Sequence, residues 1–249
     1  MARPALAQPL DAPATGIALM SAAMLLAPLL DVFSKLLTET VSPGQAAIGR
    51  FVAQSLFLLP VLAMLGEWTR PTRLHAVAGA LLGIAIFCIN SALAVMPVAN
   101  AIAIFFVEPL ILTLLSALIL GERLGWRRLS AVAVGLAGAM IVLRPNLAAF
   151  GPEAALPLVT AFAFACYLLI TRVMSQRGAR WALQFWNGLF AILTLLALSL
   201  VAAPLGIASA ALGPMGWHEI GLMAAMGLVA CTSHQLLAQA FARAEAGAL

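Results

Sequence analysis

The sequence is poor in charge: only 9% of its 249 residues are charged, whereas 64% are apolar. A soluble globular domain is about half apolar and about a quarter charged. A soluble fold cannot hide so much apolar surface, because too little of its volume lies inside. The composition therefore excludes a soluble globular protein and predicts an integral membrane protein.

Several chemical signatures are also missing. The three cysteines, Cys88, Cys166 and Cys231, lie far apart within apolar segments, with no C-x-x-C pair or His/Cys cluster. We expect them to be packing residues, and we expect no metal and no cofactor. No G-x-x-x-x-G-K-[ST] loop occurs, so no nucleotide-driven step is expected. The net charge of +4 comes from short basic clusters between apolar segments, so no nucleic-acid partner is expected.

What is present is a series of long apolar runs. A helix needs about 20 residues to cross a bilayer. The runs are continuously apolar, which predicts helices rather than strands, and Met96-Pro97 divides a run that is too long for one span. Eight segments qualify, the fifth being short: Gly16–Leu37, Ala46–Gly66, Leu74–Val95, Val98–Leu120, Leu129–Leu143, Ala154–Met174, Trp181–Ala203 and Trp217–Ala240. The predicted fold class is an all-α integral membrane bundle, preceded by a disordered cytoplasmic tail over residues 1–15.

Lysine and arginine are distributed unevenly between the two sides that these segments define. Cytoplasmic loops carry an excess of both residues. With the N-terminus inside, the outer side receives only Lys35 and Arg144, while Arg50 lies within a span. The inner side receives the other ten: Arg3, Arg70, Arg73, Arg123, Arg127, Arg128, Arg172, Arg177, Arg180 and Arg243. This bias predicts a multi-pass protein of the inner (plasma) membrane with a cytoplasmic N-terminus.

The two parts of the chain resemble each other in layout. A shift of 137 residues places Lys35 on Arg172 and Arg50 on Asn187, at corresponding points of two helix pairs. Five spans per repeat is an odd number, so the second copy would enter the membrane inverted. Inverted repeats are typical of secondary transporters whose substrate site lies near the midplane. We therefore assign residues 16–145 to a first repeat of five helices and 154–249 to an incomplete second repeat of three.

Particular residues give the chain a family resemblance. They are Asp31-x-x-x-Lys35, Ser42-Pro43-Gly44-Gln45, Arg50, Pro109, Leu120-Gly121-Glu122, Gly135, Gly138 and Arg144-Pro145. In these features the chain resembles the EamA branch of the drug/metabolite transporter superfamily. The resemblance implies two inverted repeats of five helices, cytoplasmic termini and transport of small metabolites such as amino acids or nucleosides. Against that pattern the chain has eight transmembrane helices of an expected ten.

Glu108 is the first candidate for a functional residue. It lies about ten residues, or roughly 15 Å, into the fourth segment, which places it near the midplane. Pro109 follows it and is expected to kink the helix. Charged groups inside a membrane are costly and mark function by default. Two readings stay open: a partner for a substrate ammonium or a coupled proton, and a neutral carboxyl hydrogen-bonded between helices.

Asp31, Lys35 and Arg50 form the second candidate group. Asp31 and Lys35 are four residues apart and share a helix face, and Arg50 lies about one turn into the next segment. They predict an ionic cluster toward the outer side. The cluster would be either a gate that contacts a substrate carboxylate or a structural network that ties the first two helices together.

Uncharged side chains within the spans complete the list of candidates: Asn90, Tyr167, Trp186 and His234. Each is either a substrate contact or a polar link between helices. His234 stands out because histidine titrates near neutral pH. The spacing Gly79-x-x-x-Gly83 and the pair Gly135/Gly138 predict close helix packing.

Together these features predict a secondary transporter, an exporter of a small metabolite such as an amino acid, that works by alternating access as a monomer or homodimer. Glu108 and His234 leave proton coupling open. The alternatives are a truncated or non-transporting membrane scaffold and, with less support, a membrane enzyme. No clustered nucleophile, base or metal set is visible that would favour the enzyme.

Overall fold

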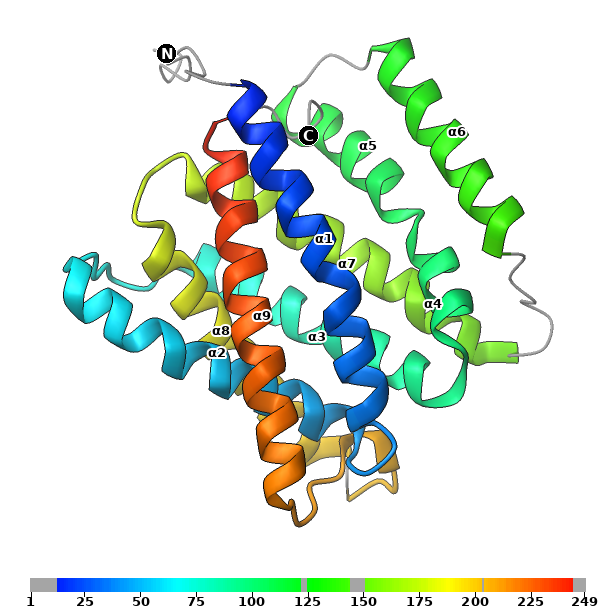
Figure 1. Ribbon diagram of the computed structural model, residues 1–249, viewed down its shortest axis with the longest axis vertical. Helices are drawn as coiled ribbons and strands as arrows, with labels where there is room; N and C mark the ends of the chain where they lie inside the picture. The colour runs from blue at the N-terminus through cyan, green and yellow to red at the C-terminus, as the bar shows by residue number, and fades with distance from the viewer. Residues whose placement is uncertain (1–12, 122–124, 144–150, 203, 244–249) are drawn as a thin grey trace.

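The computed structural model describes residues 13–121, 125–143, 151–202 and 204–243, and these residues form helices and loops without a strand (Figure 1). A helical bundle is the expected outcome for apolar spans, since each helix satisfies its backbone hydrogen bonds internally. Four residues of the predicted family pattern and topology signal lie outside the described residues: Glu122, Arg123, Arg144 and Pro145.

The helices follow the predicted segments closely, with ends that differ by no more than about three residues. Their bounds are α1 Pro13–Leu37, α2 Pro43–Leu65, α3 Arg73–Val95, α4 Val98–Phe105, α5 Glu108–Leu120, α6 Trp126–Leu143, α7 Ala155–Ser175, α8 Arg180–Ala202 and α9 Trp217–Phe241. Two short 3-10 turns, η2 Gly151–Ala154 and η3 Ala208–Ala210, lie in the connections. The first turn of α1 and the last turn of α9 lie at the same end of the bundle (Figure 1).

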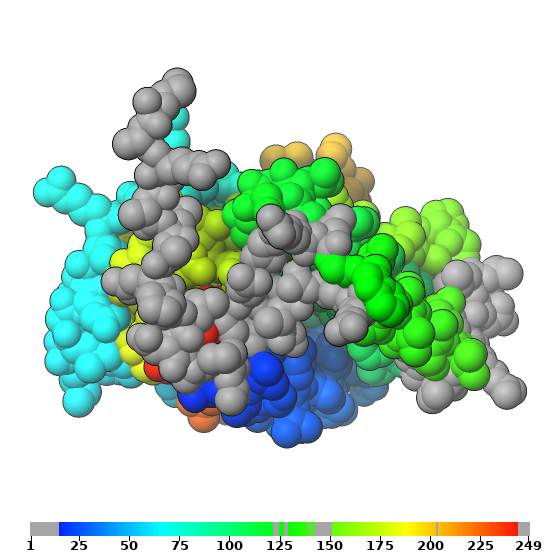
Figure 2. Space-filling view, turned by 90° about the horizontal axis from the view of Figure 1, so that it is seen from above, coloured from blue at the N-terminus to red at the C-terminus, as the bar shows by residue number. Residues whose placement is uncertain are grey.

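Seven helical stretches of the described chain are long and apolar enough to cross a membrane. The fourth, Val98–Leu120, contains a break, because α4 ends at Phe105 and α5 begins at Glu108. The fifth predicted segment forms a helix, α6, in which the described stretch Leu129–Gly138 is an apolar helix shorter than a full span. Figure 2 shows α6 and α2 at opposite sides of the bundle.

The helices pack in a pattern that pairs the two parts of the chain. α3 packs against α7 and α8, and α9 packs against α1 and α2. α2 also packs against α8, while α4 and α5 lie against α7 and support α6 from the inside. The largest buried cluster is centred on α3 and α7, where Leu82, Leu93, Tyr167 and Leu168 are almost fully buried.

Glycines bring the backbones of these helices close together. A Cβ added at Gly79 of α3 would lie 2.6 Å from the carbonyl oxygen of Asn187 in α8, and Gly83 faces Ala191 one turn further on. On the other side, a Cβ at Gly227 of α9 would lie 3.0 Å from the carbonyl oxygen of Arg50 in α2. The close packing predicted for Gly79 and Gly83 is therefore confirmed.

Gly135 and Gly138 make no such contact with the described residues. No described atom lies within 4 Å of a Cβ placed at either position, since α6 presents this face to the outside of the bundle. A small-residue face permits close approach, but it does not supply the partner.

Gly227→Ala is expected to destabilise the fold. The added methyl group would lie 2.5 Å from the Cβ of Ala53 and 2.8 Å from the backbone nitrogen of Gln54, which cannot rotate away. Overpacking of this kind costs about 1–3 kcal/mol. Gly221→Ala in the same helix is the control, because its Cβ meets nothing within 4 Å and alanine favours a helix. Thermal unfolding in detergent measures the difference, and equal midpoints for the two variants would contradict the packing described.

Candidate functional site

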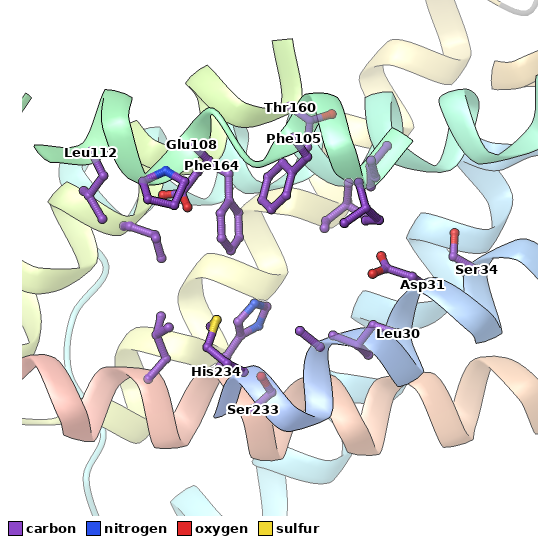
Figure 3. A pocket seen from close by; sticks show the side chains of 18 of the residues that line it. Leu30, Asp31, Ser34, Phe105, Glu108, Leu112, Thr160, Phe164, Ser233 and His234 are labelled. Atoms are coloured by element: carbon purple, nitrogen blue, oxygen red, sulfur yellow. The ribbon is translucent and has the colours of Figure 1, made fainter. Parts of the chain in front are cut away.

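The candidate site is a cavity of about 380 Å³ in the centre of the bundle (Figure 3). Helices α1 to α7 and α9 all contribute to its walls, so the site draws on both parts of the chain. Most of the lining is apolar, and α1 supplies Met20, Met24, Ala27 and Leu30. Small-molecule sites of this kind combine an apolar wall with a few polar groups that orient the ligand.

A row of four rings runs beside and into this cavity. The ring centroids of Phe105 and Phe164 are 5.9 Å apart, those of Phe164 and Tyr167 are 5.5 Å apart, and those of Tyr167 and His234 are 5.9 Å apart. Phe105 and Phe164 enter the cavity from one side and His234 enters from the other (Figure 3). These distances lie in the range of favourable aromatic pairs, so the row forms one firm wall.

Glu108 lines the cavity at the break between α4 and α5. Pro109 cannot donate to the carbonyl of Phe105, four residues earlier, and the helix restarts after Phe106 and Val107. The Glu108 side chain is only 7% exposed, and its Oε1 has no hydrogen-bond partner. The kink predicted from Glu108-Pro109 is thus confirmed, and it turns a buried carboxyl group toward the cavity.

Asp31 and Arg50 line the same cavity from α1 and α2. The Asp31 carboxylate points into it (Figure 3). Arg50 is 2% exposed, its Nε has no partner, and its guanidinium carbon lies 5.1 Å from the centroid of the Phe51 ring. No ion pair joins Asp31 and Arg50 within the part of the chain that the structure describes.

Lys35 lies outside this group. Its Nζ donates to the backbone carbonyl of Leu93 at 2.7 Å, and Lys35 is not among the residues that line the cavity. The three-residue ionic cluster expected from the sequence is therefore not what the geometry shows. A carbonyl of α3 satisfies the lysine, while Asp31 and Arg50 face the cavity without it.

Asn90 and His234 both line the cavity but differ in what they offer. Asn90 accepts from the Ser34 hydroxyl at 2.6 Å and donates to the carbonyl of Pro43 at 3.2 Å, so its amide ties α3 to α1 and α2. His234 is 5% exposed, and its Nδ1 has no hydrogen-bond partner. The histidine is thus available to a ligand, whereas the asparagine is largely occupied.

Tyr167 and Trp186 do not line the cavity. Tyr167 is fully buried in the ring row, and its hydroxyl oxygen accepts from Nε2 of Gln184 at 3.4 Å. Trp186 donates its indole N–H to the carbonyl of Thr69 at 2.9 Å, so it fixes α8 to the connection between α2 and α3. Both residues shape the bundle rather than contact a ligand in the cavity.

Several residues that line the cavity were not among the candidates predicted from the sequence, although helical spacing indicates them. Starting from Asp31, steps of three or four residues back along α1 lead to Ala27, Met24 and Met20. On α7 the same spacing joins Thr160, Phe164 and Leu168. These residues carry no charge, and apolar residues on a membrane helix give no sign by themselves of facing a cavity rather than lipid.

No group of three or more His, Cys, Asp or Glu residues that could hold a metal ion is found in the described ranges. The polar atoms of the cavity instead come from single side chains on different helices, among them Asp31, Arg50, Glu108 and His234. This arrangement can bind an organic molecule through several separate hydrogen bonds.

Comparisons with known proteins agree with this architecture. Residues 14–144 match the EamA-like transporter family, which is part of the drug/metabolite transporter superfamily. This chain belongs to the EamA-like transporter family. It is therefore a multi-pass membrane protein of a transporter family, and its apolar spans agree with that.

Two related proteins and one solved structure are also similar to this chain. A riboflavin transporter of Rhizobium johnstonii is 29% identical over 228 residues, which cover 88% of this chain and 71% of that protein. A riboflavin transporter of Vibrio cholerae is 34% identical over 84 residues, covering 34% of this chain and 28% of the other. A crystal structure with 22% sequence identity superimposes with a TM-score of 0.62 over 91% of this chain and 82% of that one. The last comparison supports the fold alone.

The effects of Asp31→Asn and Lys35→Met on stability are expected to be additive. Lys35 is satisfied by the Leu93 carbonyl, so its loss should cost about 1 kcal/mol whether or not Asp31 is charged. A double-mutant cycle from thermal unfolding should give a coupling below about 0.5 kcal/mol. A coupling well above that value, with the double variant more stable than either single variant, would instead support a structural ion network between Asp31 and Lys35.

Proposed function

We propose that this EamA chain is a secondary transporter that binds a small planar heteroaromatic metabolite of the flavin class in its central cavity. The observation that carries the proposal is that the rings of Phe105, Phe164 and His234 line the cavity beside polar groups that have no protein partner. Flat aromatic ligands stack on such rings, and unpaired polar groups gain most from a ligand that satisfies them.

The size of the cavity and the nature of the relatives support the same class of substrate. About 380 Å³ lies within the range of about 300–1,000 Å³ that is typical of small-molecule pockets. Two relatives carry the name riboflavin transporter. Riboflavin combines a flat tricyclic ring with a polyhydroxyl chain, so it matches an apolar aromatic wall with scattered polar side chains.

An amino acid is the second candidate substrate, and one observation favours it. Arg50 and Glu108 line one cavity, so a guanidinium and a carboxyl group are available to hold a carboxylate and an ammonium group. The predominantly apolar lining and the ring row favour the flavin, because a small zwitterion would leave these surfaces uncovered. Direct competition between the two classes of ligand in one assay decides between them.

We also propose that transport proceeds by alternating access between two inverted repeats, with α6 as an eighth span. The glycine crossings support the repeat. Gly79 meets the carbonyl of Asn187, and Gly227 meets the carbonyl of Arg50, which is the residue that the shift of 137 aligns with Asn187. The packing of α3 on α7 and α8 likewise mirrors that of α9 on α1 and α2. Export and proton coupling, together with an inner-membrane location and a cytoplasmic N-terminus, belong to the same proposal.

Purified protein in liposomes is expected to transport riboflavin, and Phe164→Ala should weaken riboflavin binding about tenfold through the loss of a stacking surface. Quenching of flavin fluorescence measures binding, and counterflow of labelled riboflavin measures transport. Phe162→Ala is the matched control, because Phe162 lies on the same helix but is 55% exposed on the outside of the bundle. Equal loss in both variants would contradict the site. Binding without transport would favour a non-transporting scaffold, and chemical conversion of riboflavin would favour an enzyme.

Proton coupling is expected to depend on Glu108. Glu108→Gln keeps the shape of the side chain but cannot release a proton, so an imposed pH gradient should no longer accelerate riboflavin transport, while exchange without a gradient continues. Glu39→Gln provides the control, since Glu39 is exposed beyond the end of α1. Protease access to an N-terminal tag shows which way the protein is inserted in the vesicles, so transport by oriented vesicles gives the direction of transport. Protease access to the same tag in cells gives the orientation of the protein in the cell membrane. An unchanged gradient response in Glu108→Gln would refute the coupling role.

A further inference from the structure

Asp31 and Arg50 carry opposite charges and face the same cavity without forming a pair. The Asp31 carboxylate enters the cavity from α1, and Arg50 lines it from α2. Arg50 is 2% exposed and donates no hydrogen bond to the described residues, and its Nε has no partner. Two opposite charges that line one cavity without pairing offer a ligand both an acceptor and a donor.

The neighbouring polar groups do not satisfy these two side chains. Ser34 and Asn90 lie next to them along the wall but hydrogen-bond to each other and to the carbonyl of Pro43. Lys35, the cation nearest to Asp31 along α1, donates to the carbonyl of Leu93. The other ionisable groups of the cavity are Glu108 on α5 and His234 on α9.

A buried charge that lacks both a partner and hydrogen bonds is strongly unfavourable, so such a group is retained where a ligand completes it. A ligand that completes both side chains must donate to a carboxylate and accept from a guanidinium. An imide edge has this pattern, because an N–H lies between two carbonyl groups. The flavin ring carries one imide edge, which lies opposite its dimethylbenzene end.

Resting on the flavin-class substrate proposed above, we propose that Asp31 and Arg50 recognise the imide edge of the substrate ring. The imide N–H donates to the Asp31 carboxylate, and a flanking carbonyl oxygen accepts from the Arg50 guanidinium. The remaining ring area lies along Phe105 and Phe164, which enter the cavity from α4 and α7 (Figure 3). Asp31 and Arg50 are thus the residues that select this heterocycle against flat aromatic molecules without an imide.

The experiment compares riboflavin with riboflavin methylated on its imide nitrogen, using fluorescence quenching by purified protein in detergent. Methylation removes the N–H, so wild-type protein should bind the methylated form about ten- to a hundredfold more weakly, as expected for a hydrogen bond to a charged group. Asp31→Ala should bind both forms about equally. A site built around such a bond discriminates strongly against an analogue that lacks the group.

Two further variants test the assignment of roles. Leu30→Ala changes the neighbouring wall residue and leaves the carboxylate, so the full methylation penalty should remain. Arg50→Lys keeps the charge but loses the planar fork, so riboflavin should bind about tenfold more weakly while the methylation penalty persists. Thermal unfolding of each variant establishes that it is folded before binding is measured.

The possible outcomes separate this inference from the function on which it rests. If wild-type protein binds no flavin, both are overturned. If it binds riboflavin but the methylation penalty is unchanged in Asp31→Ala, the imide recognition is wrong while the flavin function stands. If Asp31→Ala does not fold, a competition experiment on wild-type protein takes its place. Lumichrome keeps the imide edge of the ring but lacks the polyhydroxyl chain. Lumichrome should displace riboflavin, whereas lumichrome methylated on its imide nitrogen should not. Equal displacement by both forms would overturn the proposal.

Discussion

The rest of this structure depends on close backbone contact at glycine crossings between helices. Gly79 and Gly83 bring α3 against α8, and Gly227 brings α9 against α2. In a membrane, hydrophobicity does not favour a helix–helix contact over a helix–lipid contact, so close packing must supply the attraction between helices. Because Gly227 meets the backbone at Arg50, the crossing also fixes the position from which this arginine reaches the cavity.

The cavity follows from a second constraint, which is that backbone groups in a bilayer must be satisfied or must line a cavity. The break between Phe105 and Glu108 is placed where α4 and α5 face the interior, against α7. The break and the rings of Phe105, Phe164 and His234 form part of the wall of the site, and Arg50, Glu108 and His234 bring polar atoms without a protein partner to it. An aromatic surface beside unpaired polar groups is the combination that a flat, hydrogen-bonding heterocycle requires.

Much of the fold could be predicted from the sequence, because membrane helices are specified locally. A run of about 20 apolar residues and a proline break need no information from elsewhere in the chain, and the observed helix ends lie close to the predicted ones. The site was only partly predictable. Charged residues in apolar spans, such as Glu108, Asp31 and Arg50, stand out by composition, whereas Phe164 and Met24 do not. The expected role of Lys35 in an ion cluster was misplaced, because a distant carbonyl at Leu93 satisfies it.

The sequence by itself determined the class of protein, the approximate ends of the helices, and the family to which the chain belongs. These properties follow from composition, apolar run length and local motifs, which depend only on the order of the residues along the chain. Only the tertiary structure decided that Tyr167 and Trp186 lie outside the lining of the cavity, that Gly135 and Gly138 meet no described neighbour, and that Asp31 and Arg50 line one cavity without an ion pair among the described residues. The physical reason is that these properties depend on which helix faces are turned toward each other, and that choice is made by packing between segments far apart in the chain.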